Sequence, residues 1–171
     1  MNNCILPTVT DSCLSRSELL DSFHAYFNSM RNPAGFTINL HPKIRRKING
    51  KWVSLALDSS IIENFWDYFN GELLHLNYYS YERKMNRSRI LAFANVERGK
   101  ATGIYHFHGA IDNHYEIEDR VFRYCILSAF KNANYHHKII SGDIDLNLCV
   151  DIGWVDYVFK DKHLCYPLIA K

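Results

Sequence analysis

The segment His106-Phe107-His108 is the strongest candidate for chemistry in the sequence. Residues i and i+2 of a β-strand point to the same face, so the two imidazoles would project together while Phe107 points away. Two imidazoles on one strand provide half of a divalent-metal site. With nine histidines in 171 residues, roughly half of one such pair is expected by chance, so a third ligand decides the interpretation.

Glu97 is the candidate third ligand. It lies at the far end of the strand that precedes the two histidines, next to a polar turn over 97–102. A hard carboxylate oxygen beside two imidazoles would suit Mg²⁺ or Mn²⁺ and leave positions open for a phosphate. The alternative is a solvated carboxylate in a hairpin turn.

Tyr157 and Lys160 stand at positions i and i+3 of an expected late helix, where side chains are neighbours on one face. A tyrosine can act as a covalent nucleophile once its proton is removed. A nearby ammonium stabilises both a phenolate and a phosphate. Tyr81 and Lys84 have the same spacing, but their Tyr-rich helical stretch favours packing and a solvated basic face.

Two basic clusters are candidates for phosphate contacts, with Tyr and Trp nearby for base stacking. The alternative for each is an ordinary solvated face. The first comprises Lys43, Arg45, Arg46, Lys47 and Lys51, and the second Arg83, Lys84, Arg87 and Arg89. The phosphate-binding pattern GxxxxGK[ST] does not occur, so no nucleotide cofactor is expected.

Composition indicates one globular domain over 1–171. Apolar residues make up 47%, charged residues 22%, and the net charge is only +2, which excludes a disordered or strongly basic chain. Five cysteines without a CxxC pair favour free thiols in a reducing compartment. We expect no signal peptide and no membrane span, and hence a cytoplasmic protein.

The expected elements alternate between helices and strands. Ser15 and Glu18 have capping-box spacing and begin a helix over 15–30. Alternating apolar residues predict a strand over 35–41. A second helix is expected from Ser60, with Glu63 completing its cap, and further helix extends to about 86.

The second half of the chain is expected to add a hairpin of strands 89–96 and 103–111. A helix over 116–131, a strand over 144–151 and a short helix over 153–161 follow. Hairpin-linked strands interleaved with helices predict an α+β fold with an antiparallel sheet.

The order of the motifs is more specific than any one of them. Phe36-Thr37-Ile38-Asn39 on a first strand is followed by His106-Phe107-His108 on a hairpin strand and by Tyr157-Val158-Phe159-Lys160 on a late helix. This order resembles the three motifs of the HUH endonucleases, in particular the single-tyrosine rolling-circle replication initiators (Rep proteins) of small plasmids and single-stranded DNA viruses. The resemblance spans roughly residues 35–161.

The resemblance implies a central antiparallel sheet of about five strands flanked by helices. It implies that His106, His108 and Glu97 hold Mg²⁺ or Mn²⁺ against a phosphate of single-stranded DNA. Tyr157 would attack that phosphate, form a 5′-phosphotyrosine and release a 3′-OH, with Lys160 stabilising charge. The implied DNA-binding residues are Thr37, Asn39, Lys43, Arg45, Arg46 and Lys47.

Two departures from the family qualify this expectation. We expect a single domain without a helicase domain, so a helicase of the host cell would be the partner. The segment over 42–87 is expected to be helical and is longer than in compact viral domains. A single-tyrosine HUH transposase or a relaxase stays open, as does a non-catalytic nucleic-acid binding module on an RRM-like sheet.

Overall fold

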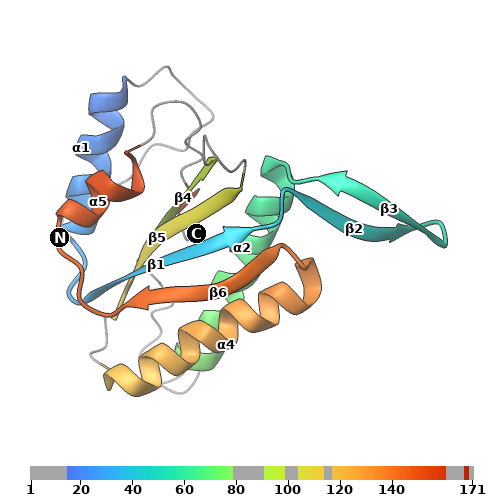
Figure 1. The fold of residues 1–171 in the computed structure, drawn as a ribbon. Coiled ribbons are helices and arrows are strands. Elements are labelled where there is room, and N and C mark those ends of the chain that lie inside the picture. Colours follow the sequence, from blue (N-terminus) through green and yellow to red (C-terminus); the bar gives the residue numbers. More distant parts are fainter. Residues whose placement is uncertain (1–14, 79–90, 99–103, 114–116, 161–167, 170–171) are drawn as a thin grey trace.

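The computed structural model describes residues 15–78, 91–98, 104–113, 117–160 and 168–169 (Figure 1). The elements run in the order α1 (Arg16–Phe27), β1 (Pro33–Leu40), β2 (Lys43–Ile48), β3 (Lys51–Ala56), α2 (Ser59–Leu73), the π-helix η1 (Leu74–Tyr78), β4 (Ala92–Arg98), β5 (Tyr105–Asp112), α4 (Asp119–His137), β6 (Ile140–Asn147), α5 (Gly153–Val158) and β7 (Leu168–Ile169).

Five strands form one antiparallel sheet in the order β6-β1-β5-β4-β7. The β2–β3 hairpin forms a separate two-stranded sheet, which projects away from the body of the protein (Figure 1). The predicted α+β class, with a central antiparallel sheet flanked by helices, is confirmed.

One face of the sheet packs against α2 and α4 and forms the larger core. Phe36 and Phe107 from neighbouring strands meet Phe65, Trp66 and Phe130 from the two helices, all almost fully buried. Burial of each such side chain stabilises the fold by about 1.5–3 kcal/mol. Phe107 therefore faces the core, as expected, and the residues on either side of it face the opposite way.

The opposite face of the sheet is covered by α1 and α5 at one end (Figure 1). Phe23 of α1 and Phe159, which follows α5, pack on each other with ring centroids 4.4 Å apart and on Phe93 of β4. This second core fixes α5 against the sheet. The polar residues toward the other end of the same face form the candidate site described below.

The predicted helices are found at the expected places in the chain, but some of their first and last residues differ. Ser15 caps α1 through the expected capping box with Glu18. The cap of α2 is Asp58 and not Ser60, because the Asp58 carboxylate accepts from Ile61 N while Ser60 Oγ donates to the same carboxylate. The helix expected over 116–131 is α4, which starts later and runs to His137, where Lys138 in a left-handed conformation ends it.

The strand predictions contain one clear error. The segment over 42–87 was expected to be helical, but it opens with the β2–β3 hairpin. The turn is Asn49-Gly50, both with positive φ, a dipeptide typical of tight hairpin turns. The strand expected over 144–151 is β6, which begins and ends four residues earlier.

Among the described helices, none is both long enough and apolar enough to cross a membrane.

Candidate active site

The strand register places the predicted motifs side by side on one face of the sheet. Glu97 of β4 lies opposite His106 of β5, so it belongs to the strand and not to the expected turn. On the other side of β5, β1 places Thr37 opposite His108 and Asn39 opposite His106. Directly opposed residues share a face, so the three central strands present all five side chains together.

A chain of hydrogen bonds runs through His108. Its Nε2 lies 3.0 Å from Glu97 Oε1, and its Nδ1 lies 2.9 Å from Thr37 Oγ1. His108 is 2% exposed and Glu97 is 5% exposed, so both groups depend on these contacts in place of water. The ring of His106 lies nearly parallel to that of His108, with centroids 5.8 Å apart.

Burial lowers the pKa of His108, and the positive charges of Lys160 and His106 act in the same direction. The bond to Glu97 opposes this shift but is outweighed. The lowered pKa favours the neutral form of His108. A neutral ring that donates from Nε2 to the Glu97 carboxylate accepts at Nδ1 from the Thr37 hydroxyl.

The donor set fits a hard divalent ion in its chemistry. Imidazole and carboxylate ligands must be deprotonated to bind metal, and the second oxygen of Glu97 is buried with no hydrogen-bond partner among the described residues. The 3.0 Å between Glu97 Oε1 and His108 Nε2 is also about the separation of two adjacent ligands in octahedral coordination with bonds of ~2.1 Å.

As they stand, the described residues contain no group of three or more His, Cys, Asp or Glu side chains arranged to hold a metal ion. Glu97 and His108 bond directly to each other. Metal binding would exchange this bond for two bonds to the ion, with Thr37 still able to accept from Nδ1 of His108.

Tyr157 reaches this group from the far end of the chain. Its ring packs edge-on against His108, with centroids 5.2 Å apart, and the side chain remains 39% exposed. Lys160 Nζ lies 4.1 Å from the centre of the Tyr157 ring and 3.4 Å from Glu97 Oε1. Lys160 stands beyond the end of α5, which is shorter than expected, but it still reaches the site.

Two contacts that the sequence did not reveal hold α5 in place. The buried Asn95 amide donates to the Val158 carbonyl across a 2.8 Å bond, and the Trp154 indole donates to the Gly109 carbonyl at 2.9 Å. Trp154 packs closely over Gly35, where an added Cβ would lie only 2.5 Å from the indole. The sequence feature that could have indicated a structural role for Asn95 is a polar Asn at an inward-facing position of a predicted strand.

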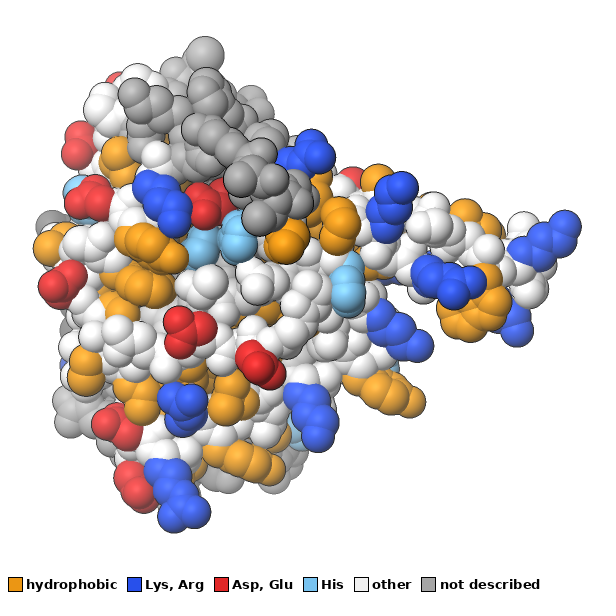
Figure 2. Space-filling view, in the orientation of Figure 1, with side chains coloured by type: hydrophobic (Ala, Val, Ile, Leu, Met, Phe, Trp, Pro, Cys, Tyr) orange, Lys and Arg blue, Asp and Glu red, His pale blue; other side chains and the backbone are white. Residues whose placement is uncertain are grey.

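The predicted basic residues do not join this site. Lys43, Arg45, Arg46 and Lys47 all lie on β2 in the projecting hairpin, and blue side chains follow the hairpin and its base in Figure 2. Pairing places Lys47 on the same hairpin face as Trp52, with Arg46 on the opposite one. The second basic cluster and the Tyr81–Lys84 pair lie outside the described residues.

Comparisons with protein-family models, with curated proteins and with solved structures gave no match to this chain.

Proposed function

We propose that this protein is a rolling-circle replication initiator that nicks and rejoins single-stranded DNA through Tyr157. The observation that carries the proposal is the convergence of Glu97, His106, His108, Tyr157 and Lys160 at one place on the sheet. These residues come from two adjacent strands, the late helix α5 and the segment just after it, and they are the ones expected of a single-tyrosine HUH endonuclease.

The reaction is a transesterification at phosphorus. The phenolic oxygen of Tyr157 forms a bond to the scissile phosphorus while the bond from phosphorus to the 3′ oxygen breaks. The phenol loses its proton, and the departing 3′ oxygen gains one to become a free 3′-OH. One phosphodiester replaces another, so the reverse reaction can rejoin the strands without an energy source.

Each side chain has a role that its position supports. Tyr157 is partly exposed and can meet a phosphate, while the Lys160 ammonium beside its ring favours negative charge on the phenol and on the phosphate. Glu97, His106 and His108 would hold Mg²⁺ or Mn²⁺. When bound, that ion would supply positive charge to the phosphate oxygens. Thr37 is a positioning residue that orients the His108 ring.

The competing proposal of a non-catalytic RRM-like module has less support. Such a module stacks bases on aromatic side chains of its open sheet face. In the described strands of the five-stranded sheet, Phe36, Phe93 and Phe107 are fully buried, and Tyr105 is partly buried against the larger core. The polar end of the open face carries histidines, Thr37 and Asn39 instead. A transposase or relaxase of the same superfamily would share the two histidines and the late tyrosine, whereas the Phe36–Asn39 motif and the spacing of Tyr157 and Lys160 favour a replication initiator.

The test is covalent capture of DNA. Purified protein, a randomised single-stranded DNA pool and Mn²⁺ or Mg²⁺ should give a protein–DNA adduct that survives SDS. The adduct should be lost with EDTA and with Tyr157→Phe. Tyr135→Phe, a matched change at an exposed tyrosine of α4, should leave it unchanged. An adduct that persists in Tyr157→Phe, or DNA binding with no adduct under any condition, would refute the proposal.

A further inference from the structure

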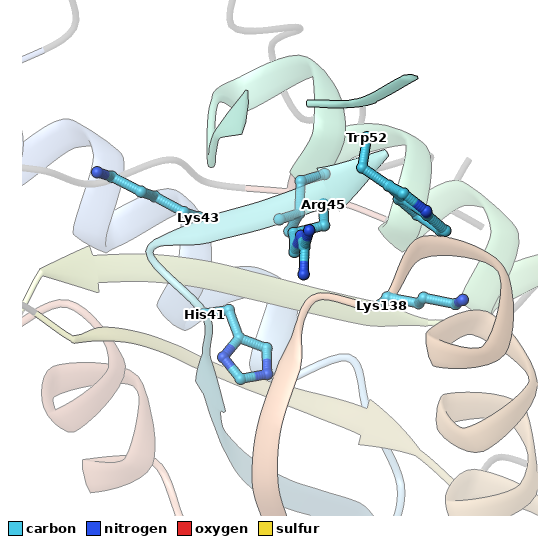
Figure 3. Close-up of a pocket in the computed structure, with 6 residues that line it drawn as sticks. His41, Lys43, Arg45, Trp52 and Lys138 are labelled. Atoms are coloured by element: carbon cyan, nitrogen blue, oxygen red, sulfur yellow. The ribbon is translucent and has the colours of Figure 1, made fainter. Parts of the chain in front are cut away.

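A pocket of about 410 Å³ lies at the base of the β2–β3 hairpin (Figure 3). Its volume falls within the ~300–1,000 Å³ typical of small-ligand sites. Three of its six lining residues carry a fixed positive charge and none is acidic. The lining residues are His41, Lys43, Ile44, Arg45, Trp52 and Lys138.

Trp52 supplies a flat aromatic surface at this pocket. It is 59% exposed, and the Arg45 guanidinium lies 5.9 Å from the centre of its ring. Figure 3 shows that both side chains project from the same side of the hairpin. Aromatic rings and guanidinium planes are the surfaces on which single-stranded bases stack. The pair therefore offers a stacking platform beside positive charge.

Lys138 reaches the pocket from the opposite side and from a distant part of the sequence. It ends α4 in a left-handed conformation with φ of 55°, and its backbone N donates to the Asn134 carbonyl. This conformation directs the chain straight into β6 and leaves the ammonium at the pocket (Figure 3). Two independent elements therefore bring cations to one cavity, as a phosphate group would require.

The pocket lies along β1 from the candidate active site. Asn39 pairs with His106, and His41 follows two residues later at the pocket wall. At about 3.3 Å per residue, the four steps along the chain from Thr37 to His41 span ~13 Å, a few nucleotides of DNA. On the other side of Thr37 stands Asp145 of β6, whose negative charge disfavours a phosphate path across that edge.

We propose that this pocket binds one nucleotide of the single-stranded DNA that flanks the scissile phosphate. The base stacks on Trp52 and Arg45, and the adjoining phosphate meets Lys138. The pocket thereby sets where the strand leaves the active site. The choice of DNA as ligand rests on the proposed function, while the binding itself requires neither metal nor Tyr157.

The experiment measures binding of a short fluorescein-labelled oligothymidylate by anisotropy. It uses the Tyr157→Phe protein in EDTA, so that no cleavage contributes. Trp52→Leu should weaken binding on the order of tenfold, as loss of one stacked base does, while Trp52→Phe should retain most of the affinity. Lys138→Asn, a change that tolerates the left-handed backbone, should weaken binding severalfold.

Lys51→Ala is the matched control, because Lys51 is a cation of the same hairpin on the face opposite to Trp52. It should weaken binding less than Trp52→Leu. Three results would overturn the proposal, because each indicates general charge attraction. They are equal losses of affinity for Lys51→Ala and Trp52→Leu, an equal effect of Trp52→Leu on the binding of duplex DNA, and full competition by polyglutamate. The covalent-capture assay has an independent outcome, so failure of this pocket is distinguishable from failure of the nicking proposal.

Discussion

The hydroxyl of Thr37 lies 2.9 Å from Nδ1 of His108, while Glu97 lies 3.0 Å from Nε2 of the same ring. The imidazole is thus held at both nitrogens by two neighbouring strands. A hydroxyl can donate or accept, so Thr37 can bond to either tautomer of His108. It therefore keeps the ring oriented whether Nε2 donates to Glu97 or binds a metal.

Replacement of Thr37 tests this positioning. Thr37→Val keeps the shape but removes the partner of Nδ1, and loss of such an outer contact typically costs 10–100-fold in metal affinity. We expect a decrease of that order for Mn²⁺ by isothermal titration calorimetry. Thr37→Ser, which retains the hydroxyl, should bind within a few-fold of the wild type. Equal affinities for the valine and serine variants would show that the contact is dispensable.

Asn95 is predicted to position Tyr157 through α5. Asn95→Ala removes the buried donor to the Val158 carbonyl and should lower the free energy of unfolding by about 1–3 kcal/mol. It should also slow adduct formation, because α5 loses one of the contacts that fix it to the sheet. The control is Asn70→Ala, which removes a buried amide that bonds within α2. This control should lose comparable stability in urea but retain the rate of adduct formation.

Two glycines should respond in opposite ways to alanine. At Gly35 a Cβ would collide with the Trp154 ring, so Gly35→Ala should destabilise the fold by about 1–3 kcal/mol and displace α5. At Gly71 a Cβ meets nothing within 4 Å, and in the helix it should stabilise by about 0.5–1 kcal/mol. Urea unfolding measures both, and the same sign of change at the two positions would contradict the packing described here.

Acid should destabilise the protein through the half-buried His137. Burial, together with the charges of Arg46 and His136, lowers the pKa of His137. The unfolded chain therefore binds a proton more readily, and stability is lost as the pH falls below the ordinary value of about 6.5. His137→Leu should reduce the loss of unfolding free energy between pH 7.5 and 5.5. An unchanged pH dependence would exclude His137 as a contributor.

The sequence predicted the fold best where a feature depends on neighbouring residues of the chain. Alternation correctly separated the core residue Phe107 from its two histidine neighbours, and the Ser15 capping box began α1 as expected. The β2–β3 hairpin was missed because its exposed strands bury almost nothing, so no alternation of apolar residues marks them. Asn49-Gly50 was the one signal that could have revealed it.

The relations within the candidate site depend on tertiary structure. Strand register places Glu97 opposite His106, and in consecutive antiparallel strands that register depends on the length and type of the connecting turn, which the motif residues themselves do not specify. The approach of Tyr157 to His108 joins residues about 50 positions apart. It was expected only from the resemblance in motif order. The supporting contacts of Asn95 and Trp154 were not predicted, because each depends on the partner that folding brings to it.

Peptide mapping of the captured DNA tests the central claim most directly. Trypsin should release residues 139–160, in which Tyr157 is the one tyrosine, while Tyr81 falls in a different peptide that spans 52–83. After nuclease trimming of the adduct, mass spectrometry should find a nucleotide phosphate on Tyr157 in the 139–160 peptide. A nucleotide on any other residue, the 52–83 peptide included, would contradict the assignment of Tyr157 as the nucleophile.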